Sequence, residues 1–278
     1  MEIAKSILYS IGAFVFLLQS VVAEATLVNT LEKIQKKGYL EVSMTSKDQP
    51  PFFMTNEKGE LIGIDVEIAK GMAKSLKVDL KFNRNAKSFD DVIQIVSRGE
   101  ADVGISKLSY TLERARLVLY SDPYIKLRKA ILLNRVQYAK IKKERRANNL
   151  KELAGRKDFV IGVLEKSSYV NFAHSLFRSA TIQQLKTWKE DIIKSLMQGN
   201  ITAAFRDELE IKKFLLLEPN ANLNVLAIIL KDQEDPIQMV LQADDHHFQD
   251  WINGYLSISK LELNIDTILA KYKDYLAN

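Results

Sequence analysis

Polar and charged side chains follow three apolar stretches of the sequence, at the points where those stretches end. They occupy segments 106–111, 166–168 and 206–207, which supply hydroxyls, lysines, an arginine and an aspartate. Hydroxyl and ammonium groups donate hydrogen bonds, a guanidinium pairs with a carboxylate, and an aspartate accepts from cations. In an open parallel sheet, ligands bind beyond the carboxyl ends of the strands. We therefore expect the three segments to face one cleft that recognises a small polar molecule.

The same sequence offers little for catalysis. It has no cysteine and three histidines, one on a predicted helix (His174) and an adjacent pair, His246 and His247. Neighbouring positions on a helix point about 100° apart, so the pair is a poor metal site. Glu165 is the one carboxylate at the edge of the expected cleft that could act as a base. We expect no catalytic residues, no metal and no cofactor.

The elements that position these residues begin with a helix at 31–37 and a strand at 38–44. A second helix is predicted at 65–76, where apolar residues fall on one side, and alternation predicts a strand at 78–82. A strand, loop, helix and strand in this order indicate a parallel sheet covered by helices. The expected fold class is therefore α/β.

An internal repeat with a spacing of 100 residues organises the rest of the chain. The segments 91–99 and 191–199 each place apolar residues on one helical face before a glycine, and a short apolar strand follows each. Gly99 and Gly199 can end the helices in a left-handed conformation. In the second copy, a strand at 159–164 leads to a helix near Tyr169, which a serine can cap.

Composition and the N-terminus indicate where the protein works. The 278 residues carry a formal charge of +5, and the one basic cluster, at 140–146, fits a solvated face better than a nucleic-acid site. The apolar run at 7–18 is short for a membrane span, and small residues follow it, so cleavage after Ala23 or Ala25 is expected. We predict a signal peptide at 1–25, no lipid anchor, because no cysteine follows it, and a soluble periplasmic protein.

Several motifs, in this order and spacing, resemble the bacterial extracellular solute-binding proteins of family 3, which serve polar amino-acid importers. The resemblance covers the chain from about Tyr39 to the C-terminus. It is carried by PPF at 50–52, GELIGID at 59–65, GEADV at 99–103, SYTLER at 109–114, YSDPY at 120–124, AAFRD at 203–207 and the expected terminal helix at 266–276.

This resemblance implies the two-lobed type II periplasmic-binding-protein fold, in which each lobe is a mostly parallel sheet flanked by helices and two crossover strands join the lobes. Lobe 1 would comprise residues 26–124 and 235–278, and lobe 2 residues 125–234. The implied function is capture of a small polar amino acid and its delivery by a monomer to an inner-membrane ABC permease. A dehydratase resembling those that act on cyclohexadienyl acids or arogenate is the alternative on the same fold.

The resemblance also assigns the ligand's charged groups. Arg114 would hold the α-carboxylate, assisted by Ser109 and by Ser168 of the other lobe, whereas its alternative is a surface arginine beside Glu113. Asp207 would accept from the ammonium, and it is also a candidate N-cap for a helix at 208–216.

Two further residues complete the predicted site. Ser106 would face the cleft and donate to the ligand, and Phe89 would form an apolar wall unless it belongs to the core.

Departures from the family pattern leave the ligand's side chain open. Gln49 stands where a stacking aromatic is common, Ser46 where an acidic residue often lies, and Lys166 where glycine is usual. Lys107, Lys166 and Arg206 would bring positive charge towards the pocket unless they turn to solvent, which hints at an acidic or polar ligand.

Overall fold

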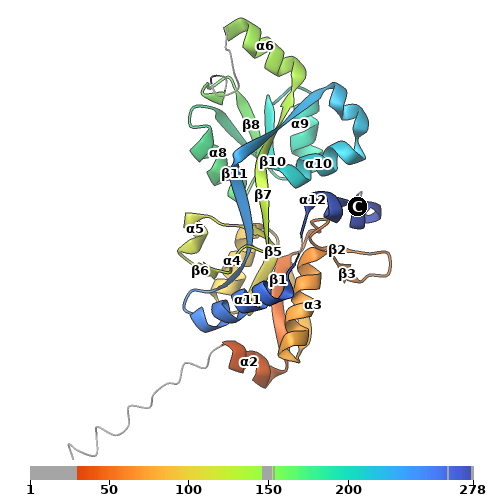
Figure 1. Cartoon of the computed structure of the whole chain (residues 1–278). Coiled ribbons are helices and arrows are strands. Elements are labelled where there is room, and N and C mark those ends of the chain that lie inside the picture. The colour runs from red at the N-terminus through yellow and green to blue at the C-terminus, as the bar shows by residue number, and fades with distance from the viewer. Residues whose placement is uncertain (1–29, 146–151, 153, 262, 277–278) are drawn as a thin grey trace, which may run out of the picture.

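The computed structural model describes residues 30–145, 152, 154–261 and 263–276. Its main sheet has nine strands in the order β4-β1-β5-β11-β7-β10-β8-β9, with β6 paired to β11 at the side. Figure 1 shows two lobes, one above the other, joined by long strands. We call the half that contains β1, β4 and β5 lobe 1, and the half that contains β8, β9 and β10 lobe 2. The predicted signal peptide lies outside the described residues.

Lobe 1 begins with a parallel sheet. β4 and β5 both pair with β1 in parallel. The elements of this part, in chain order, are α2 (Thr30–Lys37), β1 (Tyr39–Thr45), β2 (Met54–Thr55), β3 (Leu61–Ile62), α3 (Ile64–Leu76), β4 (Asp79–Ala86), α4 (Phe89–Ser97), β5 (Val103–Ser109), α5 (Leu112–Ala115) and β6 (Val118–Tyr120). The predicted helix–strand order is confirmed here, because its periodic apolar residues are the buried ones.

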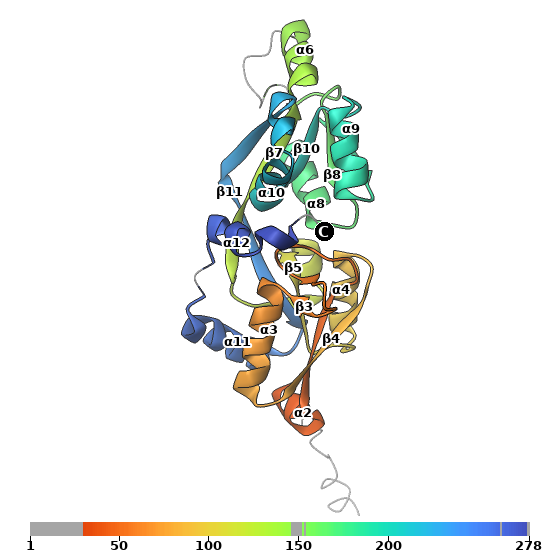
Figure 2. The ribbon, with the colours of Figure 1, turned by 90° about the vertical axis from the view of Figure 1, so that its right-hand side faces the viewer.

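Lobe 2 repeats the arrangement, with β8 pairing in parallel with both β9 and β10. Its elements are β7 (Ile125–Asn134), α6 (Arg135–Arg145), β8 (Val160–Leu164), α8 (Ser168–Leu176), β9 (Thr181–Leu185), the π-helix η1 (Trp188–Ile193), α9 (Lys194–Met197), β10 (Ala203–Asp207), α10 (Glu208–Leu217) and the 3-10 helix η2 (Pro219–Leu223). The basic cluster at 140–146 falls on α6, which projects from the tip of lobe 2 in both views, as Figure 2 shows, and its last residue lies outside the described part.

Two strands connect the lobes. β11 (Val225–Gln242) runs antiparallel to β7 in lobe 2 and to β5 and β6 in lobe 1. The pairing of β7 with β11 is irregular between Ile229 and Glu234. Through β11 the two halves form one hydrogen-bonded sheet and not two separate sheets. The exact lobe boundaries near residues 124 and 234 stay a prediction.

Buried apolar side chains form two clusters in each lobe, on opposite faces of the sheet. In lobe 1, one cluster packs under α3 and the C-terminal helices and the other under α4. In lobe 2, α8 covers one cluster, whereas η1, α9 and α10 cover the other. Each lobe therefore has its own core, and Leu209 of α10 in lobe 2 belongs to the cluster of lobe 1.

The internal repeat is confirmed in detail. Gly99 and Gly199 have φ of +70° and +76°, and each donates its N–H to the carbonyl three residues earlier. The next residue in each copy donates to the carbonyl five residues earlier. This is the hydrogen-bond pattern that ends a helix with a left-handed glycine. The second copy differs in one respect, because its helix begins as the π-helix η1.

The C-terminal segment contacts both lobes. α11 (His246–Ser259) packs against lobe 1, and α12 (Ile265–Lys271) with the 3-10 turn η3 (Lys273–Tyr275) lies between the lobes in Figure 2. The terminal helix predicted at 266–276 is thus two short helices. Lys212 of α10 forms an ion pair with Asp266 at 3.0 Å, and Lys213 donates to the Pro50 carbonyl at 2.8 Å. Both contacts join lobe 2 to parts of lobe 1.

Candidate functional site

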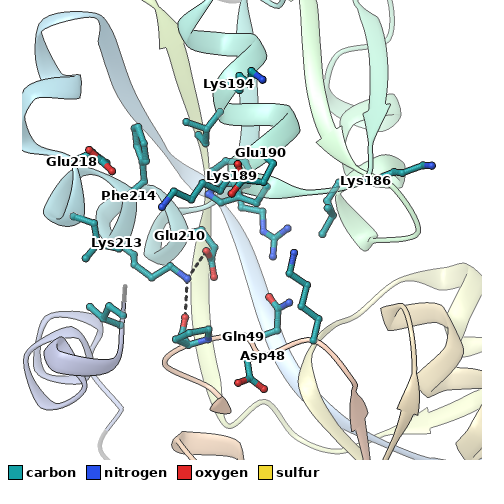
Figure 3. Close-up of a pocket in the computed structure, with 18 of the residues that line it drawn as sticks. Asp48, Gln49, Lys186, Lys189, Glu190, Lys194, Glu210, Lys213, Phe214 and Glu218 are labelled. Carbon is teal, nitrogen blue, oxygen red and sulfur yellow. Dashed lines mark hydrogen bonds and ion pairs between the residues drawn. The ribbon is translucent and has the colours of Figure 1, made fainter. Parts of the chain in front are cut away.

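A cavity of about 790 Å³ lies between the lobes. Lobe 1 contributes the ends of β1 and α4, and lobe 2 contributes the turn after β8, the start of η1 and the end of β10. Figure 3 shows side chains from both lobes converging on this space. Its lining includes Thr45, Gln49, Phe89, Lys166, Trp188 and Arg206. The arrangement suits a ligand that touches both lobes.

Beside the cavity, which Glu210 lines, a buried lysine of lobe 1 binds two buried carboxylates of lobe 2. The Lys107 ammonium lies 2.9 Å from Asp207 and 2.8 Å from Glu210. Lys213 pairs with the other oxygen of Glu210 at 2.8 Å, as Figure 3 shows. Burial pushes the pKa of Glu210 upward, but attraction to Lys107, Lys213 and Arg206 outweighs it and holds that pKa well below its usual range. Glu210 is therefore ionised.

Asp207 also caps α10, because its side chain accepts from the Glu210 N–H at 3.0 Å. Its predicted role as an N-cap is confirmed, and its other oxygen pairs with Lys107. An aspartate followed three residues later by a glutamate resembles a capping box, in which the glutamate would reach back to the cap. Here Glu210 turns to Lys107 and Lys213 instead. The sequence signal for the cap was present, whereas nothing in it pointed to the lysine partners.

The backbone of Lys107 has a left-handed conformation, with φ of +50°. Its N–H donates to Asp65 at 2.8 Å, and the Tyr124 hydroxyl donates to the other oxygen of Asp65 at 2.8 Å. Burial raises the pKa of Asp65 to about 7, although both hydrogen bonds and the nearby Lys107 charge lower it. Asp65 therefore holds the left-handed backbone conformation that directs the Lys107 side chain towards lobe 2.

Arg114 is buried, so its alternative as a surface arginine is wrong. Its Nε and Nη2 donate to one oxygen of Asp90 at 3.0 and 2.8 Å, and Nη1 donates to the Ser109 carbonyl at 3.4 Å. The partner is Asp90 and not the adjacent Glu113. The Asp90 side chain is 53% exposed. The guanidinium pairs within lobe 1 and does not line the cavity.

The other predicted residues occupy distinct places. The Ser106 hydroxyl is fully buried and accepts from the Thr45 N–H at 3.1 Å, so it supports β1. Ser168 is buried at the first turn of α8, and the helix is not capped as predicted, because the Ser167 hydroxyl donates to the Leu164 carbonyl. Phe89 is both a core residue and a wall of the cavity. Of the six predicted ligand residues, Phe89 alone lines this cavity.

A second contact between the lobes brings the start of α8 close to the Arg114 segment. Asn171 of α8 donates to Glu113 at 3.1 Å. The Tyr169 hydroxyl donates to Asp235 at 2.8 Å, and burial raises the pKa of Asp235 to about 6 against the effect of this hydrogen bond. The first turn of α8 in lobe 2 and the start of α5 in lobe 1 are therefore joined directly.

The cavity lining carries more positive than negative charge. Eight of its side chains are lysine or arginine and five are aspartate or glutamate, an excess of three positive charges. Lys186, Lys189 and Lys194 lie towards its lobe 2 side in Figure 3. Clefts lined by one sign of charge concentrate counter-ions. The predicted positive charge from Lys166 and Arg206 is present in the lining.

Among the described residues, no group of three histidine or acidic side chains is placed to hold a metal ion. None of the helices in the described part of the chain combines the length and apolarity of a membrane span.

Comparison with curated proteins finds relatives named for binding amino acids. The chain is 30% identical to an arginine-binding periplasmic protein of Mannheimia haemolytica over 60% of this chain and 62% of the relative. It is 34% identical to a glutamine-binding protein of Geobacillus stearothermophilus over 45% of each. The chain thus spans less than two thirds of these two relatives. It is 24% identical to the lysine/arginine/ornithine-binding periplasmic protein of Escherichia coli K12 over 83% of this chain and 86% of the relative.

Solved structures share the fold. An ancestral amino acid-binding protein, described as a precursor of cyclohexadienyl dehydratase, matches with a TM-score of 0.69 at 24% identity over 87% of this chain and 99% of the other. A putative ABC transporter binding component of Wolinella succinogenes matches with a TM-score of 0.70 at 22% identity over 87% and 100%. The type II periplasmic-binding-protein fold is confirmed. The family model matches residues 42–275, so this chain belongs to the bacterial extracellular solute-binding proteins, family 3.

Proposed function

We propose that this protein binds a small polar amino acid between its lobes in the periplasm and delivers it as a monomer to an inner-membrane ABC permease. The observation that carries the proposal is the cavity of about 790 Å³, which is lined from both lobes. A ligand that touches both lobes binds their closed arrangement better and so shifts the population towards closure. The closed form is then the species that the permease recognises. Family membership and the periplasmic relatives support the compartment and the partner.

The amino-acid backbone would be held by the predicted residues Arg114 and Asp207, neither of which lines the cavity in this arrangement of the lobes. A ligand carboxylate can bind the Arg114 guanidinium either beside Asp90 or in its place, since Asp90 is half-exposed and free to swing into water. Ser109, whose carbonyl accepts from Arg114, and Ser168 of lobe 2 would assist. The ligand ammonium would share Asp207 with Lys107, because a carboxylate has spare lone pairs.

The relatives are named for arginine, glutamine, histidine and the lysine group, so family membership leaves the ligand's side chain open. The lining of the cavity must decide it. Proteins of this family are binding proteins, and the neighbour described as a precursor of a dehydratase is itself an amino acid-binding protein. The dehydratase alternative is not favoured, and we propose no turnover. Glu165, its candidate base, lines the cavity among lysines.

Calorimetry of the leaderless protein with the twenty amino acids, followed by variants, tests the proposal. Removing one partner of a buried charge pair costs roughly 2–5 kcal/mol, so Arg114→Ala should weaken binding by at least about 30-fold. Arg116→Ala is the matched control, because Arg116 is an exposed arginine two residues further on. It should bind like the parent. Binding by Arg114→Ala within a factor of two of the parent would mean that the carboxylate lies elsewhere.

A further inference from the structure

Arg206 is a buried cation whose hydrogen-bonding groups are not fully used. Its side chain is 4% exposed and lines the cavity. Its Nε and Nη1 have no hydrogen-bond partner, and the nearest carboxylate oxygen, on Asp207, lies 3.5 Å from Nε. Buried donors are nearly always paired, and an unpaired buried charge is costly. A guanidinium in this state, at the wall of a cavity between two lobes, is suited to binding an anion from outside the chain.

Aromatic rings hold the guanidinium in position without satisfying its donors. Its central carbon lies 6.0 Å from the Tyr169 ring and 5.7 Å from the Trp188 ring, both at cation–π range. Tyr169 is fixed in turn by its hydrogen bond to Asp235. The planar fork of an arginine is suited to a carboxylate, which it can bind through two parallel hydrogen bonds. The rings therefore preorganise Arg206 for such a partner.

Within the network of ion pairs that contains Arg206, positive charges outnumber negative ones. Lys107, Arg206 and Lys213 supply three positive charges, and Asp207 and Glu210 supply two negative ones. All five side chains are at most 13% exposed, so water screens them little. One further negative charge would make the cluster neutral. An amino-acid backbone is zwitterionic and brings no net charge, so a bound amino acid would supply that charge through its side chain.

We propose that the bound amino acid has a carboxylate side chain and that Arg206 binds it. This inference rests on the proposed function and specifies its ligand class as acidic amino acids. An amide side chain would leave the surplus positive charge in place. A basic side chain would add a second surplus cation to a buried cluster, where like charges repel strongly. Lys107 has the complementary role of neutralising the two carboxylates that would otherwise repel an acidic ligand.

Calorimetry with matched pairs of ligands tests this directly. The pairs are L-glutamate with L-glutamine and L-aspartate with L-asparagine, which differ in charge and hardly in shape. We expect the parent to bind one acidic member at least tenfold tighter than its amide. Arg206→Gln should weaken binding of the acid by roughly 10- to 100-fold, as for a charged hydrogen bond, and should change amide binding less than threefold. Arg178→Gln, an exposed arginine outside the cavity lining, is the control.

Thermal unfolding of Arg206→Gln checks that the variant folds, and Arg206→Lys, which keeps the charge but loses the fork, should retain part of the preference for the acid. If the parent binds a neutral or basic amino acid best, or if Arg206→Gln binds acid and amide as the parent does, the assignment of Arg206 is wrong and the proposed function stands. If the parent binds none of the twenty amino acids, the proposed function and this inference fall together.

Discussion

Lys107 links the two lobes, so removing it should open the molecule. It lies on β5 of lobe 1, and its two partners, Asp207 and Glu210, belong to lobe 2. The pair distances of 2.9 and 2.8 Å exist only while the lobes are together. The perturbation that we consider is Lys107→Met, which keeps the length of the side chain and deletes its charge.

The size of the effect follows from the burial of the partners. Breaking a buried pair by removing one member costs about 3–5 kcal/mol, because the other charge is left uncompensated. If the lobes separate, Asp207 and Glu210 regain water, and an exposed pair contributes at most about 1 kcal/mol. The difference, roughly 2–4 kcal/mol, is the amount by which the substitution destabilises the closed arrangement relative to the open one. Lys107→Met should therefore shift the lobe equilibrium towards the open form by about 30- to 700-fold.

Small-angle scattering of the ligand-free protein is the assay, because separated lobes increase the radius of gyration. Lys212→Met is the control: Lys212 also joins the lobes, through Asp266, but the side chains are 34% and 79% exposed. That variant should scatter like the parent. A radius of gyration and a melting temperature in Lys107→Met equal to those of Lys212→Met would refute the reasoning.

Two further predictions concern stability. Gly104→Ala should destabilise the protein by about 1–3 kcal/mol, because the added Cβ would lie 2.6 Å from Val240 and 2.9 Å from Val92. Gly254→Ala on α11 is the contrasting variant: its Cβ meets nothing within 4 Å, and it should stabilise the protein by up to about 1 kcal/mol. Urea unfolding at pH 7.5 compares the two variants, and equal unfolding midpoints would contradict the packing argument. Burial raises the pKa of Asp65 to about 7, from an ordinary 3.8, so between these values the folded state holds a proton that the unfolded chain releases. The Asp65 contribution to the free energy of unfolding should therefore fall as the pH rises from about 4 to 7. Asp65→Asn should flatten that part of the profile, and an unchanged slope in the variant would show that the group does not titrate there.

The sequence predicted the fold well where local periodicity and the core agree. The repeat at 91–99 and 191–199 identified two helices and their terminal glycines, since the apolar stripe and the left-handed turn are both local properties. It did not predict that the second helix starts as a π-helix at Trp188–Ile193, because six residues are too few for periodicity to separate the two helix types. The crossover of β11 between the lobes came only from the family resemblance.

The site was less predictable, because its residues meet across long sequence separations. Lys107 and Glu210 are 103 positions apart, and Arg114 finds Asp90 rather than its neighbour Glu113. A lysine with positive φ in a buried strand has no local signal, since its conformation depends on Asp65, 42 positions earlier. The motifs indicated which segments come together, but which side chains pair there depends on side-chain packing.

Two residues reverse the charge that the cluster between the lobes presents to a ligand. Lys213 with Asp207 and Glu210 alone would leave one surplus negative charge, which would favour a cation. Lys107 neutralises that surplus at 2.8–2.9 Å from both carboxylates, and Arg206, with two nitrogens unpaired, then makes the cluster positive by one charge. Since water is largely excluded at this depth, a change in the net charge of the cluster from minus one to plus one makes it repel a cationic ligand that it would otherwise attract. We therefore expect ligand selectivity to depend on positions 107 and 206 together, and a variant that loses both cations should favour a basic ligand.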